Sequence, residues 1–187
     1  MAAKDIQRCA WSTNDPLYIQ YHDEEWGVPV RDDHKMFEFL ILETFQAGLS
    51  WLTILRKREN FRKAFAGFDF EKVAKFTEKD FNLLMQDAGI IRNRMKIAAA
   101  MTNAKAFIEV RKEFGTFCNY IWAFVDNKPV HSKLKLLTDI PASTPLSDAI
   151  SKDLKKRGFK FVGSTIVYAH LQACGLVNDH VKGCFRY

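Results

Sequence analysis

Helix start and stop signals recur at short intervals along this sequence, and sustained alternation of apolar and polar residues is missing throughout. Alternation with a period of two is typical of strands, whereas capped segments with apolar residues every three or four positions are typical of helices. The pattern predicts an all-α fold, a compact bundle of about eight short helices. No repeat, low-complexity tract or Pro-rich linker divides it, so we expect a single domain over residues 1–187.

Capping residues place the individual helices. Asp32 or Asp33, Ser50, Thr77 and Thr144 can each accept a hydrogen bond from a free amide of a first helical turn. Glycines follow most of the segments that these residues open, as expected for helix C-termini. The expected helices cover residues 33–46, 51–65, 78–88, 92–114, 117–125, 145–157 and 164–174. The least regular stretch is 126–145, which holds three prolines.

Composition limits the classes of function. The chain has 187 residues, 48% of them hydrophobic, which suffices for a real core. Its net charge of +6 suits a polyanionic partner without demanding one. Residues 1–11 carry charges and lack the apolar run of a signal peptide or membrane helix, so we expect a cytoplasmic protein that does not enter a membrane.

Two Cys and His pairs near the chain ends suggest a metal site. His180 and Cys184 stand four residues apart, a spacing that places both on one face of a helical turn. Cys9 and His22 can supply the other half of a Cys2His2 set. Such a closed set is typical of structural zinc; it would tie segment 1–26 to segment 176–187 and leave no position for a catalytic water. The alternative is four unrelated buried thiols and imidazoles. Cys118 and Cys174 lie in apolar stretches and are expected to be core thiols.

Glu43 is the most informative single residue. Its neighbours at helical spacing are Met36, Phe39, Leu40 and Ala47, so its carboxylate projects from an apolar face. A charge placed there is costly unless a partner compensates it. The partner could be a neighbouring segment, through a salt bridge or a helix cap, or it could be a ligand.

Ring systems are numerous in the same part of the chain. Each ring taken singly could belong to an ordinary core. Together, aromatic faces attract cations and stack on bases, and a carboxylate beside them can accept hydrogen bonds from an amino group. An N3-alkylated adenine combines a flat ring, a positive charge and an exocyclic amine. The rings are Trp11, Tyr18, Tyr21, Trp26 and Trp51.

Residues 84–94 indicate a helix, a tight turn at Gly89 and a second helix with Arg92, Arg94 and Lys96 at its start. Backbone amides at such a turn, and the positive end of the second helix, are suited to hold a phosphate. A second basic cluster comprises Lys152, Lys155, Lys156, Arg157 and Lys160. It could contact a DNA backbone, but a solvated helix face explains it equally well.

Seven short motifs are spread over nearly the whole chain. They are DPLY at 15–18, YHD at 21–23, EWG at 25–27, QAGLSW at 46–51, DAGIIR at 87–92, KRGFKFVG at 156–163 and ACGLVNDH at 173–180. With them the chain closely resembles the bacterial 3-methyladenine DNA glycosylase I family, a zinc-containing branch of the helix-hairpin-helix glycosylase superfamily. The resemblance implies a hydrolase of base-excision repair that flips 3-methyladenine out of alkylated double-stranded DNA and releases it as the free base.

The resemblance also assigns roles to residues. It implies one structural zinc ion on Cys9, His22, His180 and Cys184. It implies a base pocket of Trp11, Tyr18, Tyr21 and Trp51, with Glu43 as the catalytic acid that hydrogen-bonds the methylated adenine. It implies DNA contacts at Gly48 and at Leu49, the apolar wedge, and a phosphate anchor at the Gly89 hairpin, within a helix-hairpin-helix at about 78–108, next to Arg92 and Arg94.

One departure concerns the wider superfamily. Many of its members place a catalytic Asp after the hairpin, whereas here no acidic residue follows Gly89 until Glu109. No Lys stands directly after the hairpin either, so we expect a monofunctional enzyme without a lyase step. An N3-alkylated base already carries positive charge and leaves as a neutral molecule, so little acid or base catalysis is needed. We expect water to attack the sugar, and we expect the protein to act as a monomer.

Two other functions fit parts of the sequence. A zinc-stapled DNA-binding module without chemistry would use the hairpin and the basic helices as a clamp, but it leaves Glu43 among aromatic rings unexplained. A glycosylase for another base, such as 7-alkylguanine, is the second alternative. A pocket built around a carboxylate acceptor favours a base whose exocyclic amine faces it.

Overall fold

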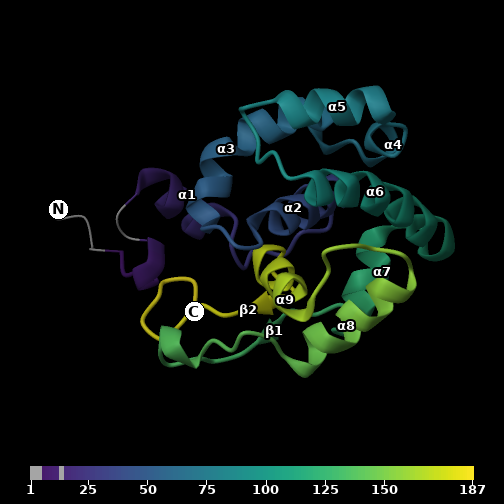
Figure 1. Ribbon diagram of the computed structural model, residues 1–187. Helices are drawn as coiled ribbons and strands as arrows, with labels where there is room; N and C mark the ends of the chain where they lie inside the picture. Colours follow the sequence, from purple (N-terminus) through teal and green to yellow (C-terminus); the bar gives the residue numbers. More distant parts are fainter. Residues whose placement is uncertain (1–5, 13–14) are drawn as a thin grey trace.

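The computed structural model describes residues 6–12 and 15–187, and it is almost entirely helical (Figure 1). Residues 1–5 of the predicted N-terminal zinc segment lie outside the described part. Short 3-10 turns η1 (Ala10–Ser12), η2 (Ala66–Phe68) and η3 (Leu137–Asp139) accompany the helices. The helices are α1 (Pro16–Glu24), α2 (Asp33–Gln46), α3 (Trp51–Ala64), α4 (Phe70–Val73), α5 (Glu78–Gln86), α6 (Arg94–Phe114), α7 (Phe117–Ala123), α8 (Pro145–Lys156) and α9 (Ser164–Ala173).

The all-α prediction is confirmed, with two small differences. A pair of two-residue parallel strands, β1 (Val130–His131) and β2 (Val177–Asn178), joins the irregular stretch 126–145 to the C-terminal segment. The helix α1 was not predicted. Its start signal is nevertheless present, because Asp15 accepts a hydrogen bond from the amide of Leu17 and Pro16 occupies the first helical position.

Helix α2 forms the centre of the molecule and contacts α3, α6, α7 and α9 (Figure 1). The side chains from Met36 to Phe45 are all buried. A helix buried on every side is apolar all round, so the two carboxylates in this run need compensation. Glu38 has it, since Arg58 Nε lies 2.7 Å from its Oε1.

Helices α5 and α6 form the pair that the sequence indicated, but with a longer connection. Helix α5 ends at Gln86 and α6 begins at Arg94, two residues later than expected, because Asn93 caps it by accepting from the amides of Met95 and Lys96. The connection therefore spans residues 87–93 and carries the hairpin glycine in its middle.

The described chain ends lie side by side. The amide of Phe185 donates to the carbonyl of Gln7 at 2.9 Å, which joins the last residues to the segment before α1. None of the described helices is both long and apolar enough to cross a bilayer.

Candidate active site and metal centre

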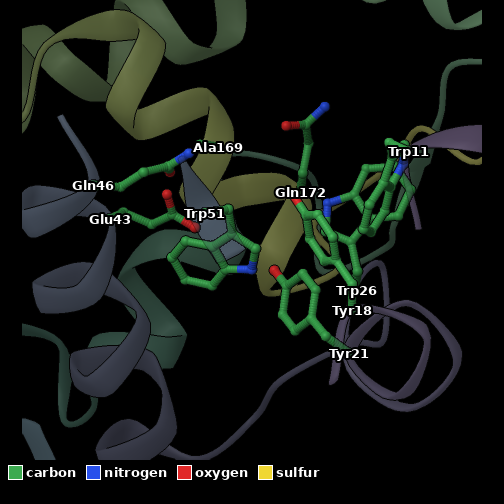
Figure 2. Close-up of a pocket in the computed structure, with 9 residues that line it drawn as sticks. All are labelled: Trp11, Tyr18, Tyr21, Trp26, Glu43, Gln46, Trp51, Ala169 and Gln172. Carbon is green, nitrogen blue, oxygen red and sulfur yellow. The ribbon is translucent and has the colours of Figure 1, made fainter. Parts of the chain in front are cut away.

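A pocket opens where α1, α2, α3 and α9 meet (Figure 2). Aromatic rings dominate its wall, and Glu43 supplies its one carboxylate among the described residues. The structure thus brings together all five residues that the sequence assigned to the base pocket. The lining residues are Trp11, Tyr18, Tyr21, Trp26, Glu43, Gln46, Trp51, Ala169 and Gln172.

Glu43 enters this pocket without a compensating charge. Its side chain is 4% exposed, and its Oε2 atom has no hydrogen-bond partner among the described residues. No described Lys or Arg lies within ion-pair distance, so the alternative of an internal salt bridge is excluded within residues 6–12 and 15–187. Burial raises the pKa of Glu43 to about 8, because the charged carboxylate loses its hydration.

The phenols beside Glu43 stay protonated. Burial raises the pKa of Tyr18, and burial with the nearby Glu43 charge holds the pKa of Tyr21 well above its usual value. The indole Nε1 of Trp51 is buried and has no acceptor in the described chain. The pocket therefore presents O–H and N–H groups together with one unpaired carboxylate.

The rings form a corner instead of an open slot. Tyr21 and Trp51 have centroids 5.3 Å apart and planes tilted by 52°, so these two rings are in contact. Stacked bases are about 3.4 Å apart, and a base held between two rings needs about 7 Å. The spacing of Tyr21 and Trp51 is therefore shorter than a parallel sandwich around a base requires. Trp11 closes the far end of the pocket, 4.9 Å from Tyr18 and 5.0 Å from Trp26.

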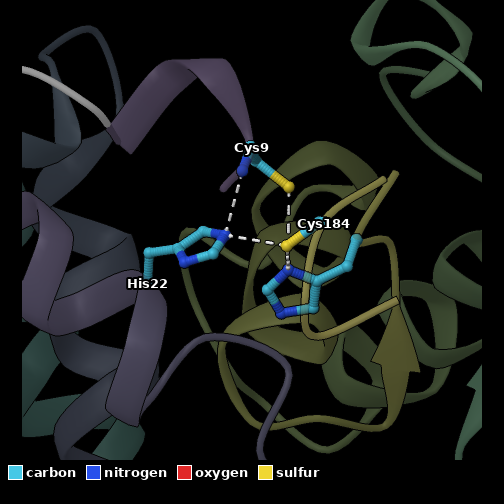
Figure 3. A group of neighbouring side chains, drawn as sticks. Cys9, His22 and Cys184 are labelled. Carbon is cyan, nitrogen blue, oxygen red and sulfur yellow. Dashed lines mark hydrogen bonds between the residues drawn. The ribbon is translucent and has the colours of Figure 1, made fainter. Parts of the chain in front are cut away.

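Cys9, His22, His180 and Cys184 form one buried cluster, and their ligand atoms all lie within 4.8 Å of one another (Figure 3). Cys184 Sγ lies 3.4 Å from His22 Nε2 and 3.4 Å from His180 Nδ1, and Cys9 Sγ lies 3.6 Å from His180 Nδ1. A tetrahedral ion with ordinary zinc bond lengths needs edges of about 3.3 to 3.8 Å. The cluster could hold a metal ion.

The imidazoles are oriented for ligation. His22 directs Nδ1 to Asp23 Oδ1 at 2.8 Å and His180 directs Nε2 to the Trp26 carbonyl at 3.1 Å, so the other nitrogen of each ring faces the cluster. Burial lowers the pKa of both rings, that of His180 to about 4, which keeps them neutral. The expected helical turn between His180 and Cys184 is wrong: an irregular turn, in which Gly183 has φ 97°, brings the two together.

The cluster lies directly behind the pocket. Trp26 packs against His180 with ring centroids 4.5 Å apart, and Trp11 packs against His22 at 5.3 Å. Gln172 of the pocket donates to Asp179, the residue before His180, at 2.7 Å. Two rings and one amide of the pocket are thus held by the segments that carry the ligands.

Gly48 and Leu49 form the turn between α2 and α3. Gly48 has φ +80°, a backbone conformation that side chains disfavour, and nothing within 4 Å would oppose a Cβ there. The amide of Leu49 donates to the Gln46 carbonyl at 2.7 Å, and the Leu49 side chain is 40% exposed. This exposed leucine thus lies in the turn between Gln46 and Trp51, two residues that line the pocket.

Gly89 lies in the connection between α5 and α6, but its own amide is taken by Asp87 Oδ1 at 2.7 Å. The amides of Ile91 and Arg92 have no acceptor among the described residues. The side chain of Arg94 lies over the Phe81 ring, 5.0 Å from its centroid. Two amides that are free to meet a phosphate therefore lie after the glycine, just before α6.

The second basic cluster is only partly available. Arg157 is held by Glu113 at 2.6 Å and by Asp153 at 2.7 Å. Lys152, Lys155, Lys156 and Lys160 are exposed. These four exposed lysines agree with the alternative interpretation of the cluster as a solvent-exposed helix face.

Three pocket residues were not singled out as site residues from the sequence, and Trp26 was named only among the nearby rings. Gln46 follows Glu43 by three positions on the same helical face, which is a usable local signal. Ala169 and Gln172 come from α9, more than 100 residues away. Nothing local in the sequence predicts that α9 packs against α2.

Comparisons with known proteins agree with this geometry. A family model described as methyladenine glycosylase matches residues 11–187. DNA-3-methyladenine glycosylase 1 of Escherichia coli is 54% identical over 182 residues, which is 97% of each chain. A crystal structure of 3-methyladenine DNA glycosylase I matches with a TM-score of 0.93 and 54% identity, over 96% of this chain and 98% of the other. A Tyr to Phe variant of such an enzyme, in complex with 3-methyladenine, matches with a TM-score of 0.93 and 38% identity, over 96% of each chain.

Proposed function

This chain belongs to the methyladenine glycosylase family, and we propose that it removes 3-methyladenine from alkylated DNA by hydrolysis of the N-glycosidic bond. The observation that carries the proposal is the unpaired Glu43 carboxylate, buried among the rings of the pocket. A buried polar atom without a partner costs free energy in the free protein, and a ligand that satisfies it recovers that cost. The relative in complex with 3-methyladenine supports this identity for the ligand.

Charge explains the selectivity. In the empty pocket a carboxyl group with a pKa of about 8 is mostly protonated at pH 7. A base that carries positive charge stabilises the ionised carboxylate, and its exocyclic amine donates a hydrogen bond to Glu43. Unmodified adenine has the amine but lacks the charge. The pocket therefore favours the alkylated base.

The chemistry requires few further groups. The alkylated base leaves as a neutral molecule, and water attacks the sugar from which it departs. Glu43 is the single carboxylate on the described pocket wall, so it contacts the base and offsets the charge that develops on the sugar. None of the nine lining residues is a lysine, which supports a monofunctional enzyme without a Schiff-base step.

Residues next to the pocket and in the hairpin make the contacts to DNA. Leu49, exposed beside Gln46 and Trp51, inserts into the gap that a flipped nucleotide leaves, and Gly48 lets the turn approach the duplex. The connection around Gly89 acts as the hairpin of a helix-hairpin-helix over about residues 78–108. It anchors a phosphate through the amides of Ile91 and Arg92, with Arg92 and Arg94 adding positive charge.

The metal is one structural zinc ion on Cys9, His22, His180 and Cys184. Two sulfurs and two imidazole nitrogens within 4.8 Å of one another suit zinc better than a harder cation. Four protein ligands leave no position for a substrate or water, so the ion's contribution is to hold together the segments behind the pocket.

The partner is double-stranded DNA, and the protein works on it as a monomer. The expected place of action is the bacterial cytoplasm, at the nucleoid, which agrees with a bacterial relative that is similar over almost its whole length.

Base release from methylated DNA tests the function. Purified protein is incubated with alkylated duplex DNA, and the released bases are separated by chromatography. Free 3-methyladenine is the expected product. Release of 7-methylguanine alone would identify a glycosylase with a different base preference. If the protein binds DNA but releases no base, it is a DNA-binding module without catalytic activity.

A further inference from the structure

Lys96 is a buried lysine that the account of the pocket does not use. It is the third residue of α6, seven positions after Gly89, and its side chain is 6% exposed. No described carboxylate lies within ion-pair distance of it. A buried ammonium group without a carboxylate needs another source of negative potential.

The C-terminus of α2 supplies that potential. Lys96 Nζ donates to the carbonyl of Phe45 at 2.9 Å and to the carbonyl of Ala47 at 2.5 Å. The last carbonyls of a helix lack intrahelical partners and form the negative end of its dipole. The last turn of α2 holds no basic residue of its own, so Lys96 reaches across from α6 to fill this role.

The second of these bonds acts on the turn that carries Leu49. The Ala47 carbonyl belongs to the peptide that leads directly into Gly48, which has φ +80° and nothing within 4 Å of the place of a Cβ. The bond from Lys96 fixes the plane of that peptide. With this plane fixed and the amide of Leu49 bonded to the Gln46 carbonyl, the backbone that carries the Leu49 side chain has a defined direction.

From these contacts we propose that Lys96 is a positioning residue, which couples the hairpin that grips the DNA to the turn that inserts Leu49. The proposal rests on the proposed functions of the hairpin and of Leu49. Lys96 is absent from the described lining of the pocket, so it acts through the turn. When the hairpin binds a DNA phosphate, Lys96 thereby determines the position at which Leu49 enters the duplex.

A double-mutant cycle tests this coupling. Lys96→Met keeps an unbranched side chain of similar helix propensity, shortened by the terminal nitrogen, and removes both donated bonds. Its single-turnover excision of 3-methyladenine from duplex DNA should fall at least about tenfold, since a misplacement of about 1 Å can cost that much or more. In a Leu49→Ala background, the same substitution should cost less than about twofold, because residues that act through one another are not additive.

Matched variants separate positioning from stability. Lys112→Met removes an exposed charge from the same helix, outside residues 78–108, and should leave excision unchanged. Lys96→Arg, which restores two donors, should recover most of the rate. Rates are compared at a temperature at which circular dichroism shows each variant folded. If Lys96→Met lowers the excision rate by the same factor in the wild-type and Leu49→Ala backgrounds, the proposal is overturned. It is also overturned if the Lys96→Met protein is unfolded at every temperature tested, because Lys96 would then be needed for folding itself.

The failures are distinguishable. No release of 3-methyladenine by the wild-type protein would refute the proposed function itself. Unchanged duplex excision by Leu49→Ala would refute the wedge. Loss in both single variants with full additivity would refute only the role of Lys96.

Discussion

Glu43 and Trp51 line the same pocket, and each leaves a buried polar atom, Oε2 and Nε1 respectively, without a partner in the described structure. One atom is an acceptor and the other a donor, yet they do not satisfy each other. Nearly all buried polar groups in native proteins are hydrogen-bonded. Two unpaired buried polar atoms in one pocket wall indicate that the pocket binds a ligand with a matching donor and acceptor.

The first prediction concerns folding stability. Glu43 has a pKa of about 8 in the folded protein and an ordinary value of 4.5. Between these values the unfolded chain releases the proton while the folded chain keeps it, so the wild type loses stability as pH rises from about 4.5 to about 8. Glu43→Gln should escape this loss and be more stable than the wild type at pH 8.5 by on the order of a few kcal/mol.

Urea unfolding at pH 4.5 and 8.5 measures this difference. Glu24→Gln, at an exposed carboxylate, serves as the control and should change little. A wild-type protein that matches Glu43→Gln at pH 8.5 would show that the Glu43 carboxylate is already compensated.

The second prediction concerns the pH dependence of excision. The ionised form of Glu43 receives the cationic base, and the ionised fraction of the free enzyme rises through a pKa of about 8. The value of kcat/KM, which reports the free enzyme, should therefore increase from pH 6 to pH 9 and then level off. Residual activity of Glu43→Gln should lack this rise; the same rise in both proteins would assign it to another group.

The third prediction concerns the metal. The ligand segments hold Trp11, Trp26 and Gln172 in the pocket wall, so loss of the ion should reduce excision as well as stability. Chelation, or Cys184→Ser, should lower the melting temperature and the excision rate together. Elemental analysis should find one zinc per chain in the wild type.

Cys118→Ala is the matched control, because Cys118 is a buried thiol outside the cluster. It should retain the ion. Full excision by a protein shown to be free of metal would contradict the supporting role of the cluster.

The fourth prediction concerns the hairpin. Arg92 is exposed beside the free amides, so Arg92→Ala should weaken binding to undamaged duplex and to damaged duplex to a similar degree. The slope of log K against log salt should fall by about 1, as expected for one lost phosphate contact. Binding titrations at several salt concentrations measure the slope. Lys128→Ala, an exposed cation in a distant turn, should leave it unchanged.

Local signals predicted much of the fold. The caps at Asp32, Ser50 and Thr144 lie where expected, because a side chain that satisfies a free amide is a contact between near neighbours. Helix α1 shows that a local signal can also be overlooked, since Asp15 and Pro16 mark its start in the usual way. The start of α6 shifted by two residues because Asn93 captured two amides, a competition that periodicity does not reveal.

Site residues could be predicted from the sequence where a residue of that type, in that setting, has few possible functions. A carboxylate on an apolar helix face, and Cys and His pairs at both ends of the chain, each point to a partner, and the structure places both sets together. The turn between His180 and Cys184 was predicted wrongly, because the same spacing arises in a helix and in an irregular turn. The presence of Gln172 in the same pocket as Glu43 depends on long-range packing, which no local pattern encodes.

The most direct test of the whole account is the single-turnover rate at which Glu43→Gln releases 3-methyladenine from duplex DNA. Glutamine keeps the shape of the side chain but cannot carry its charge. The account predicts a loss of about 10- to 100-fold, the equivalent of one charge-assisted hydrogen bond, in a protein with unchanged DNA affinity and zinc content. A rate equal to that of the wild type would show that the carboxylate at position 43 does not recognise the base.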